Sequence, residues 1–237
     1  MTLDCAGAGT VIEIRRDRSR SSPTNSSLRT GRATIAVDRS YGPSKSPGPM
    51  SSSSRVRVYM GCSLDGFIAG PDDDLGFLGE PAPETAEATE PSGGLGFDAF
   101  MEQVGAMLMG RRTHDVVAGM GVWVYGDTPV LVATHRELAP AADTVRAVSG
   151  SIGSLIGQAK EVAGARDVYL DGGDLVRQGL DAGLVDELCI TYVPVLLGGE
   201  GTRLFDDLTR QTKMEFVEHQ RMGHLLQVTA RPVRRLG

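Results

Sequence analysis

The sequence has few cysteines and no long apolar run. The three cysteines, Cys5, Cys62 and Cys189, are far apart and odd in number, which argues against a disulfide framework and a cysteine-based metal site. No run of 18 apolar residues is present, so no transmembrane helix is expected, and no apolar core marks a secretory signal. We therefore expect a cytoplasmic protein with no metal site and no membrane partner.

Basic residues are scarce outside the first segment of the chain. Residues 1–55 hold 9 Lys or Arg, 4 Asp or Glu and 12 Ser, whereas the rest of the chain holds 15 basic and 26 acidic residues. A Ser-rich segment with few large apolar side chains cannot offset its ordering entropy, so we expect residues 1–54 to be disordered and 55–237 to form one domain. Met50 is then a candidate translation start. The acidic balance of the domain argues against nucleic acid as a partner.

Strand and helix patterns alternate along the predicted domain. Strands are predicted at 55–62, 67–71, 106–110, 129–134, 145–148, 168–170, 187–196, 214–220 and 225–232, and helices at 97–104, from 111 onward, at 152–162 and at 174–182. This order predicts an α/β domain with a mainly parallel mixed sheet and antiparallel C-terminal edge strands. Pro194 suggests a bulge or an edge position in its strand. The acidic residues 72–96, rich in Gly and Pro, are predicted to form a long loop, and such loops often act as lids.

Three predicted strand ends carry groups suited to bind anions. Gly172 and Gly173 follow a buried strand and precede a helix, where glycine admits unusual backbone conformations and the helix start offers free N–H groups. The run from Gly110 to Thr113 begins another helix with two arginines that oppose the helix dipole, a cost that an anionic ligand would remove. Thr134-His135-Arg136 ends the next strand with a further cation. The plain alternatives are a simple connection at the glycine pair and a solvated helix start with Arg112 paired to Asp115.

The three candidate sites meet at one place if the sheet is parallel. Open α/β sheets bind ligands beyond the carboxyl ends of their strands, so a long polyanion such as a dinucleotide would reach all three. The familiar glycine fingerprint of dinucleotide-binding domains is absent, because its spacing match at residues 94–99 follows a loop and not a strand. A Walker-type lysine motif is absent as well.

Three segments resemble the dihydrofolate reductase-like superfamily in order and spacing. They are Ser63-Leu64-Asp65-Gly66-Phe67-Ile68-Ala69, Met109-Gly110-Arg111-Arg112-Thr113, and Asp171-Gly172-Gly173 before a helix. The closer likeness is to the C-terminal reductase domain of the bifunctional riboflavin-pathway deaminase-reductase. It covers roughly residues 55–235 and includes the Leu-Gly-Gly-Glu-Gly ending of residues 193–201. The resemblance implies the three-layer sandwich of that superfamily and an NADPH-dependent reductase.

The resemblance also implies which residues bind the cofactor. It assigns the helix start and the next strand end to the 2′-phosphate and pyrophosphate region, the glycine pair to the pyrophosphate and nicotinamide ribose, and the turn after the first strand to the nicotinamide. The residues so assigned are Ile68, Ala69, Gly110, Arg111, Arg112, Thr113, Thr134, Arg136, Asp171, Gly172, Gly173, Asp174 and Leu175. Several arginines near one ribose also favour NADPH over NADH on electrostatic grounds.

The proton donor is harder to predict than the cofactor site. Hydride addition to a C=N or C=O bond leaves an anion that needs a proton, and Asp65 is the best carboxylate by position. Asp-Gly is also the commonest turn dipeptide, so a purely structural role stays open for it. Asp98 and Glu102 lie near the place of the first-helix carboxylate of dihydrofolate reductases, but the local pattern does not match. Trp123 and Tyr125 either line a flat substrate pocket or anchor an ordinary loop.

The sequence thus predicts hydride transfer from NADPH to a small heterocyclic, imine or carbonyl substrate. One alternative is the 5-amino-6-(5-phosphoribosylamino)uracil reductase of riboflavin biosynthesis, although no zinc deaminase motif accompanies the domain. Dihydrofolate reduction and a non-catalytic nucleotide-binding module are further alternatives. Strand edges at 185–197 and 225–232 favour a homodimer.

Overall fold

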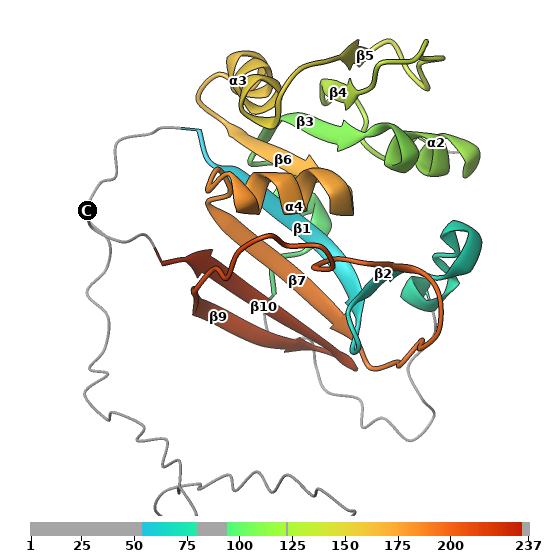
Figure 1. The fold of residues 1–237 in the computed structure, drawn as a ribbon, viewed down its shortest axis with the longest axis vertical. Coiled ribbons are helices and arrows are strands. Elements are labelled where there is room, and N and C mark those ends of the chain that lie inside the picture. Colours follow the sequence, from blue (N-terminus) through green and yellow to red (C-terminus); the bar gives the residue numbers. More distant parts are fainter. Residues whose placement is uncertain (1–53, 80–93, 122, 234–237) are drawn as a thin grey trace, which may run out of the picture. The chain divides into compact units, whose positions relative to one another are not determined.

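An eight-stranded mixed sheet organises the chain (Figure 1). The computed structural model describes residues 54–79, 94–121 and 123–233, so the predicted disorder of residues 1–54 falls outside the described residues except at Ser54. The elements in chain order are β1 (Val56–Ser63), β2 (Phe67–Ala69), the 3-10 turns η1 (Pro71–Asp73) and η2 (Gly76–Gly79), α1 (Phe97–Met101), β3 (Val104–Gly110), α2 (Arg111–Gly119), β4 (Val130–Ala133), β5 (Val145–Val148), α3 (Ile152–Ala163), β6 (Asp167–Asp171), α4 (Gly173–Asp181), β7 (Glu187–Val193), β8 (Thr202–Arg203), β9 (Met214–Met222) and β10 (Leu225–Pro232).

The strand order is β5-β4-β3-β6-β1-β7-β10-β9. The strands from β5 to β7 in this order are parallel, and β10 and β9 are antiparallel to their neighbours. This confirms the predicted mainly parallel sheet with antiparallel C-terminal edge strands. Because these strands are parallel, their carboxyl ends meet at one edge of the sheet, as the prediction of a shared ligand site requires.

The outer edges of the sheet are not the ones predicted. β7 lies between β1 and β10, and β10 lies between β7 and β9, so residues 185–197 and 225–232 contain inner strands. The edges are β5 and β9. Pro194 marks neither a bulge nor an edge: β7 ends at Val193, because a proline has no N–H group to continue the ladder. The two segments that were expected to form a homodimer interface are therefore not edge strands. The homodimer stays a prediction.

Alternating side chains along the strands build a core on each face of the sheet. Leu108 and Leu170 point to the face covered by α3 and α4. Met109 and Tyr169, one residue away on the same strands, point to the opposite face, where they pack with Phe100 of α1 and other side chains of α1 and α2. Helices on both faces of one sheet give three layers, which confirms the predicted dihydrofolate reductase-like sandwich.

Several predicted elements differ from the observed ones at their ends. α1 ends at Met101 and not at 104, because Val104 already begins β3. The predicted loop 72–96 includes η1 from its second residue onward and all of η2, and its residues 80–93 lie outside the described residues. Within the described ranges, no helix is long and apolar enough to cross a membrane.

A small second sheet holds the turn after β1 against the C-terminal part of the chain. β2 pairs with β8 in antiparallel fashion, so Phe67 lies opposite Arg203. The Arg203 guanidinium lies 4.0 Å from the centre of the Phe67 ring, a cation–π contact that adds to the backbone pairing. This pairing fixes Ile68 and Ala69 beside the carboxyl edge of the large sheet.

Buried charges at the opposite, amino-terminal edge of the sheet are paired with one another. Arg57 is 4% exposed, and its guanidinium lies 2.7 Å from the Glu187 carboxylate and 3.3 Å from that of Asp167. Arg231 contacts the same Glu187 carboxylate at 2.8 Å. These contacts join β1, β6, β7 and β10. Burying a charge without a partner costs free energy, so the ion pairs of this cluster hold the four strands in register with one another.

Candidate active site

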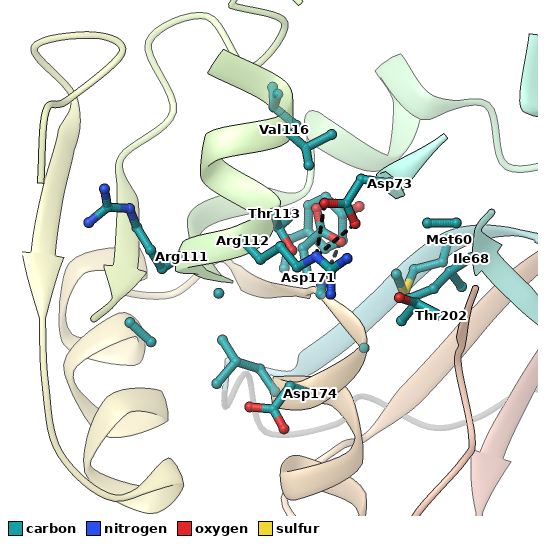
Figure 2. Close-up of a pocket in the computed structure, with 18 of the residues that line it drawn as sticks. Met60, Ile68, Asp73, Arg111, Arg112, Thr113, Val116, Asp171, Asp174 and Thr202 are labelled. Carbon is teal, nitrogen blue, oxygen red and sulfur yellow. Dashed lines mark hydrogen bonds and ion pairs between the residues drawn. The ribbon is translucent and has the colours of Figure 1, made fainter. Parts of the chain in front are cut away.

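A cavity of about 810 Å³ opens along the carboxyl edge of the large sheet (Figure 2). Its volume lies in the range that suits a cofactor or a small-molecule ligand. The ends of β1, β3, β4 and β6 and the first turns of α2 and α4 supply its walls, together with β2 and the 3-10 turns. The cavity therefore lies where ligands bind in open parallel sheets.

Two helices begin at the cavity without a side-chain cap. Gly110 precedes α2 and Gly172 precedes α4, and neither glycine has a side chain that could accept a hydrogen bond from the first turn. The backbone N–H groups of these turns and the positive ends of both helix dipoles are thus left to attract an anion. We call residues 110–113 and 172–175, which all line the cavity, the glycine side.

The two adjacent glycines of the glycine side serve different purposes. Gly172 has a φ of +94°, and a Cβ atom there would lie 2.6 Å from Thr113 Oγ1, so both its backbone conformation and the space around it require glycine. Gly173 has no unusual φ. A Cβ atom there would lie 2.9 Å from Ile68 Cδ1 and 3.0 Å from Arg177 Nη1. Glycine at position 173 thus lets the Ile68 and Arg177 side chains pack closely against the start of α4.

Arg111 and Arg112 leave the start of α2 in opposite directions (Figure 2). Arg111 forms an ion pair with Asp115 at 2.8 Å and donates to the Glu137 carbonyl oxygen, whereas Arg112 lies 2.7 Å from the Asp73 carboxylate. The predicted ion pair between Arg112 and Asp115 is therefore wrong, because Asp115 pairs with Arg111 and Arg112 pairs with Asp73. Each pair engages part of a guanidinium group and leaves other N–H donors at the rim of the cavity.

The end of β4 contributes less than predicted. Thr134 lines the cavity, and its hydroxyl accepts a hydrogen bond from the Arg136 backbone N–H at 3.0 Å. The exposed Arg136 side chain instead lines an adjoining hollow that shares Asp73 and Arg112 with the cavity. Two basic side chains that were not assigned to the cofactor, His135 and Arg177, do line the cavity. Arg177 follows Gly173 by four residues on α4, and that helical spacing was the available signal.

Asp65 does not reach the cavity. Its carboxylate accepts hydrogen bonds from the Ser63 hydroxyl at 2.7 Å, from Gly198 N at 2.9 Å and from Leu197 N at 3.2 Å. These hydrogen bonds lower the pKa of Asp65 to about 2, and the one from the Ser63 hydroxyl has the largest effect. A carboxylate with this pKa is a poor proton donor near neutral pH, and its contacts show a role in fixing the loop after β7.

Asp171 is the carboxyl group that the structure brings to the cavity. It ends β6, is 7% exposed and accepts a hydrogen bond from Gly172 N at 2.7 Å. Burial raises the pKa of Asp171 to about 6, although the hydrogen bond from Gly172 N and the nearby hydroxyls of Tyr125 and Tyr169 oppose the rise. A carboxyl group with such a pKa can give up or accept a proton near neutral pH.

Aromatic side chains from four separate segments form the other side of the cavity. Tyr59, Phe97, Tyr125 and Tyr169 all line it, and we call them the aromatic side. The Phe97 ring lies 5.9 Å from that of Tyr59 and 6.4 Å from that of Tyr125, and the Tyr169 hydroxyl donates to the Tyr59 carbonyl oxygen at 2.7 Å. Trp123 packs edge-on against Tyr125 from behind. Of the two alternatives for this region, Tyr125 lines the pocket and Trp123 supports it.

The structure gathers nearly all of the predicted cofactor-binding residues around one cavity. Those that line it are Ile68, Ala69, Gly110, Arg111, Arg112, Thr113, Thr134, Asp171, Gly172, Gly173, Asp174 and Leu175. Their role in binding stays a prediction. Within the described ranges, no group of three or more His, Cys, Asp or Glu side chains is placed to hold a metal ion.

Known proteins share both the sequence pattern and the fold. The family model of the RibD C-terminal domain matches residues 114–228. A solved structure of a putative riboflavin biosynthesis protein from Shewanella sp. PV-4 is 31% identical, covering 76% of this chain and 99% of that one, with a TM-score of 0.65. The uncharacterized protein YwjB of Bacillus subtilis is 27% identical, covering 72% of this chain and 94% of its own length.

More distant structures share the fold alone. The diaminohydroxyphosphoribosylaminopyrimidine deaminase/5-amino-6-(5-phosphoribosylamino)uracil reductase of Thermotoga maritima is 17% identical, covering 77% of this chain and 57% of that one, with a TM-score of 0.54. Together with the Shewanella protein, these matches confirm the resemblance that the glycine and arginine motifs indicated. The chain belongs to the family of the RibD C-terminal domain, the riboflavin-pathway reductase domain.

Proposed function

We propose that this chain is an NADPH-dependent reductase that transfers a hydride to a small heterocyclic, imine or carbonyl substrate. The observation that carries the proposal is the convergence of two uncapped helix starts and two arginines on one cavity that also holds a buried carboxyl group. The family is one of reductases, which supports an oxidoreductase. NADPH and the substrate are our proposals.

The glycine side fits a dinucleotide phosphate chain. Gly110 and Gly172 leave the N–H groups of two helix starts without a side-chain cap, so these groups can donate to phosphate oxygens. Arg111 and Arg112 are placed to favour a 2′-phosphate through charge-assisted hydrogen bonds. Bound NADPH would supply the hydride, and the residues of the chain would orient it, exclude water and move the proton.

Asp171, and not Asp65, is our candidate for the residue that delivers the proton. It lies at the junction of the two sides of the cavity, directly before Gly172 on one side and in contact with the hydroxyls of Tyr125 and Tyr169 on the other. A substrate held against the tyrosines would therefore meet both the cofactor and this carboxyl group. Asp65, with its carboxylate engaged by Gly198 N and Leu197 N, positions the loop after β7.

Titration of the purified chain with NADPH and NADH tests the proposal. Because Trp123 packs against Tyr125 of the cavity wall, its fluorescence is a suitable signal. We expect NADPH to bind at least tenfold more tightly than NADH. Substitution R112A should reduce that preference roughly ten- to hundredfold, the range for a lost hydrogen bond to a charged group. R146A on β5, which exposes its arginine away from the cavity, is the matched control.

Two results would reject this assignment: equal affinities for the two cofactors, or no binding of either. NADPH oxidation assayed against pterins, ribosylated pyrimidines and simple imines or carbonyls then separates an enzyme from a binding module. Cofactor binding without turnover of any of these compounds would favour the module.

Reduction of 5-amino-6-(5-phosphoribosylamino)uracil is the second candidate function. Membership of the RibD C-terminal domain family favours it. The same panel, with this compound included, decides between the two candidates. A homodimer and a cytoplasmic location remain predictions from the sequence.

A further inference from the structure

The two sides of the cavity differ in charge. The basic side chains that line it are Arg111, Arg112, His135 and Arg177, and all four lie on or beside the glycine side, at the start of α2, after the end of β4 and on α4. The segments that carry Tyr59, Phe97 and Tyr125, together with η2, cover residues 59–61, 76–79, 97–101 and 123–128. None of these segments contains Lys, Arg or His.

The remaining surface of the aromatic side is apolar. Leu78, Val116, Met120 and Val124 line the cavity together with the aromatic rings. The rings are held in place: Phe100 packs 4.8 Å from Tyr59 and 5.1 Å from Tyr169. Such a wall favours a flat ring system, because aromatic faces stack or pack edge-on at these distances.

Acidic side chains line the cavity and its adjoining hollow beside Arg112. Asp73 lines the cavity and forms an ion pair with Arg112, whose side chain is 70% exposed (Figure 2). Asp72 and Asp74 flank Asp73 in the chain and line the adjoining hollow. Four carboxylates, those of Asp72, Asp73, Asp74 and Asp115, line this hollow with only two guanidinium groups, those of Arg112 and Arg136, so a dianionic phosphate entering here would be repelled.

We propose that the aromatic side binds a flat, unphosphorylated heterocycle and discriminates against phosphorylated relatives of the same ring. The inference rests on the proposed function, because it assigns the cations of the cavity to the cofactor. Polar recognition is left to the carboxyl group of Asp171 and the hydroxyls of Tyr125 and Tyr169, which suit ring N–H and C=O groups. The physiological substrate would then differ from a phosphoribosylated pyrimidine.

Matched ligand pairs test the inference. In the presence of saturating NADP⁺, calorimetric titration compares 5-amino-6-ribosylaminouracil with its 5′-phosphate, and 6-hydroxymethyl-7,8-dihydropterin with its diphosphate. We expect the unphosphorylated member of at least one pair to bind, and to bind at least tenfold more tightly than its phosphorylated partner. Equal or tighter binding of the phosphorylated member overturns the inference, and so does binding of neither member of either pair.

A substitution that adds a positive charge to the aromatic side tests the inference without relying on how tightly the unmodified protein binds these ligands. Val124 lines the cavity and is 53% exposed, so V124K is tolerated without burial of a charge. We expect V124K to raise the affinity for the phosphorylated member of each pair at least tenfold more than it raises the affinity for NADPH. L196K, at a position that is 69% exposed and outside the cavity, should change neither. No gain in V124K would count against the inference.

Failure of this inference can be told apart from failure of the proposed function. A chain that binds no NADPH defeats the proposed function, whatever the result with the heterocycles. A chain that binds NADPH and prefers the phosphorylated ligands defeats only the inference about the substrate.

Discussion

At the amino-terminal edge of the sheet, Arg57 forms ion pairs with Asp167 and Glu187 within 3.3 Å, whereas at the carboxyl edge Asp171 is buried beside a cavity and accepts a hydrogen bond from the neutral Gly172 N–H group. Both edges bury charged or ionisable groups, and β6 contributes to both, with Asp167 at its start and Asp171 at its end. The first arrangement serves stability. The second leaves a proton and a set of helix starts available to a ligand.

Removing one partner of the paired cluster should have the largest effect. E187Q leaves Arg57, which is 4% exposed, without its nearest counter-charge, and breaking a buried pair in this way costs about 3–5 kcal/mol of unfolding free energy. Urea denaturation measures the loss. NADPH affinity of the folded protein should not change.

The matched control for this prediction is E218Q, on the exposed surface of β9. It should change the unfolding free energy by less than about 0.5 kcal/mol. Equal losses of unfolding free energy in the two variants would show that the Arg57 cluster does not stabilise the fold.

The same kind of change at the other edge should stabilise the protein. The folded-state pKa of Asp171 is raised from 3.8 to about 6, so its contribution to stability is fully present below pH 3.8 and is lost as the pH rises through 6. The loss amounts to about 3 kcal/mol. D171N should remove this loss, so its unfolding free energy should exceed that of the unmodified protein at pH 8 but not at pH 3.5.

The same substitution, D171N, should lower activity although it raises stability. If Asp171 delivers the proton, D171N should lower kcat at least a hundredfold and abolish the decline of kcat above pH 6. D143N, which removes an exposed carboxylate outside the cavity, controls for the loss of negative charge. A D171N enzyme with an unchanged pH profile would exclude this role for Asp171.

Narrowing the glycine side should have the smallest effect on stability and a clear effect on binding. In G173V the new side chain would press on Ile68 and Arg177, whose flexible ends can move only into the cavity region, so NADPH affinity should fall at least tenfold. G157V, at an exposed glycine of α3 with open space around it, carries the same helix penalty of a β-branched residue. Cofactor titration of both variants, with thermal unfolding as the check of the fold, separates the two effects.

Sequence patterns predict the glycine side well because its chemistry is local. Gly110 with its two arginines and the Gly172–Gly173 pair each lie at a strand-to-helix junction within a few residues, and parallel pairing of β3 with β6 brings them together. Position along the strand end sufficed to find them. Arg136 shows the limit of that approach: it follows the right strand but its side chain points into the adjoining hollow.

The aromatic side could not be predicted in the same way. Tyr59, Phe97, Tyr125 and Tyr169 come from four segments that only the tertiary fold assembles, and singly each resembles an ordinary core residue. The same holds for Asp65. Its Asp-Gly turn suggested either a catalytic or a structural role, and the choice depends on hydrogen bonds to Leu197 and Gly198, more than 130 residues away.

Segment 123–128 carries Tyr125 into the cavity from outside any helix or strand of the sheet. Connecting segments of this kind accept substitution and changes of length more readily than strand ends do. Residues 110–113 and 172–175, in contrast, are set by the register of β3 and β6. We therefore expect the proposed ligand preference to respond to the exchange of one short surface segment, with the proposed cofactor side of the cavity left as it is.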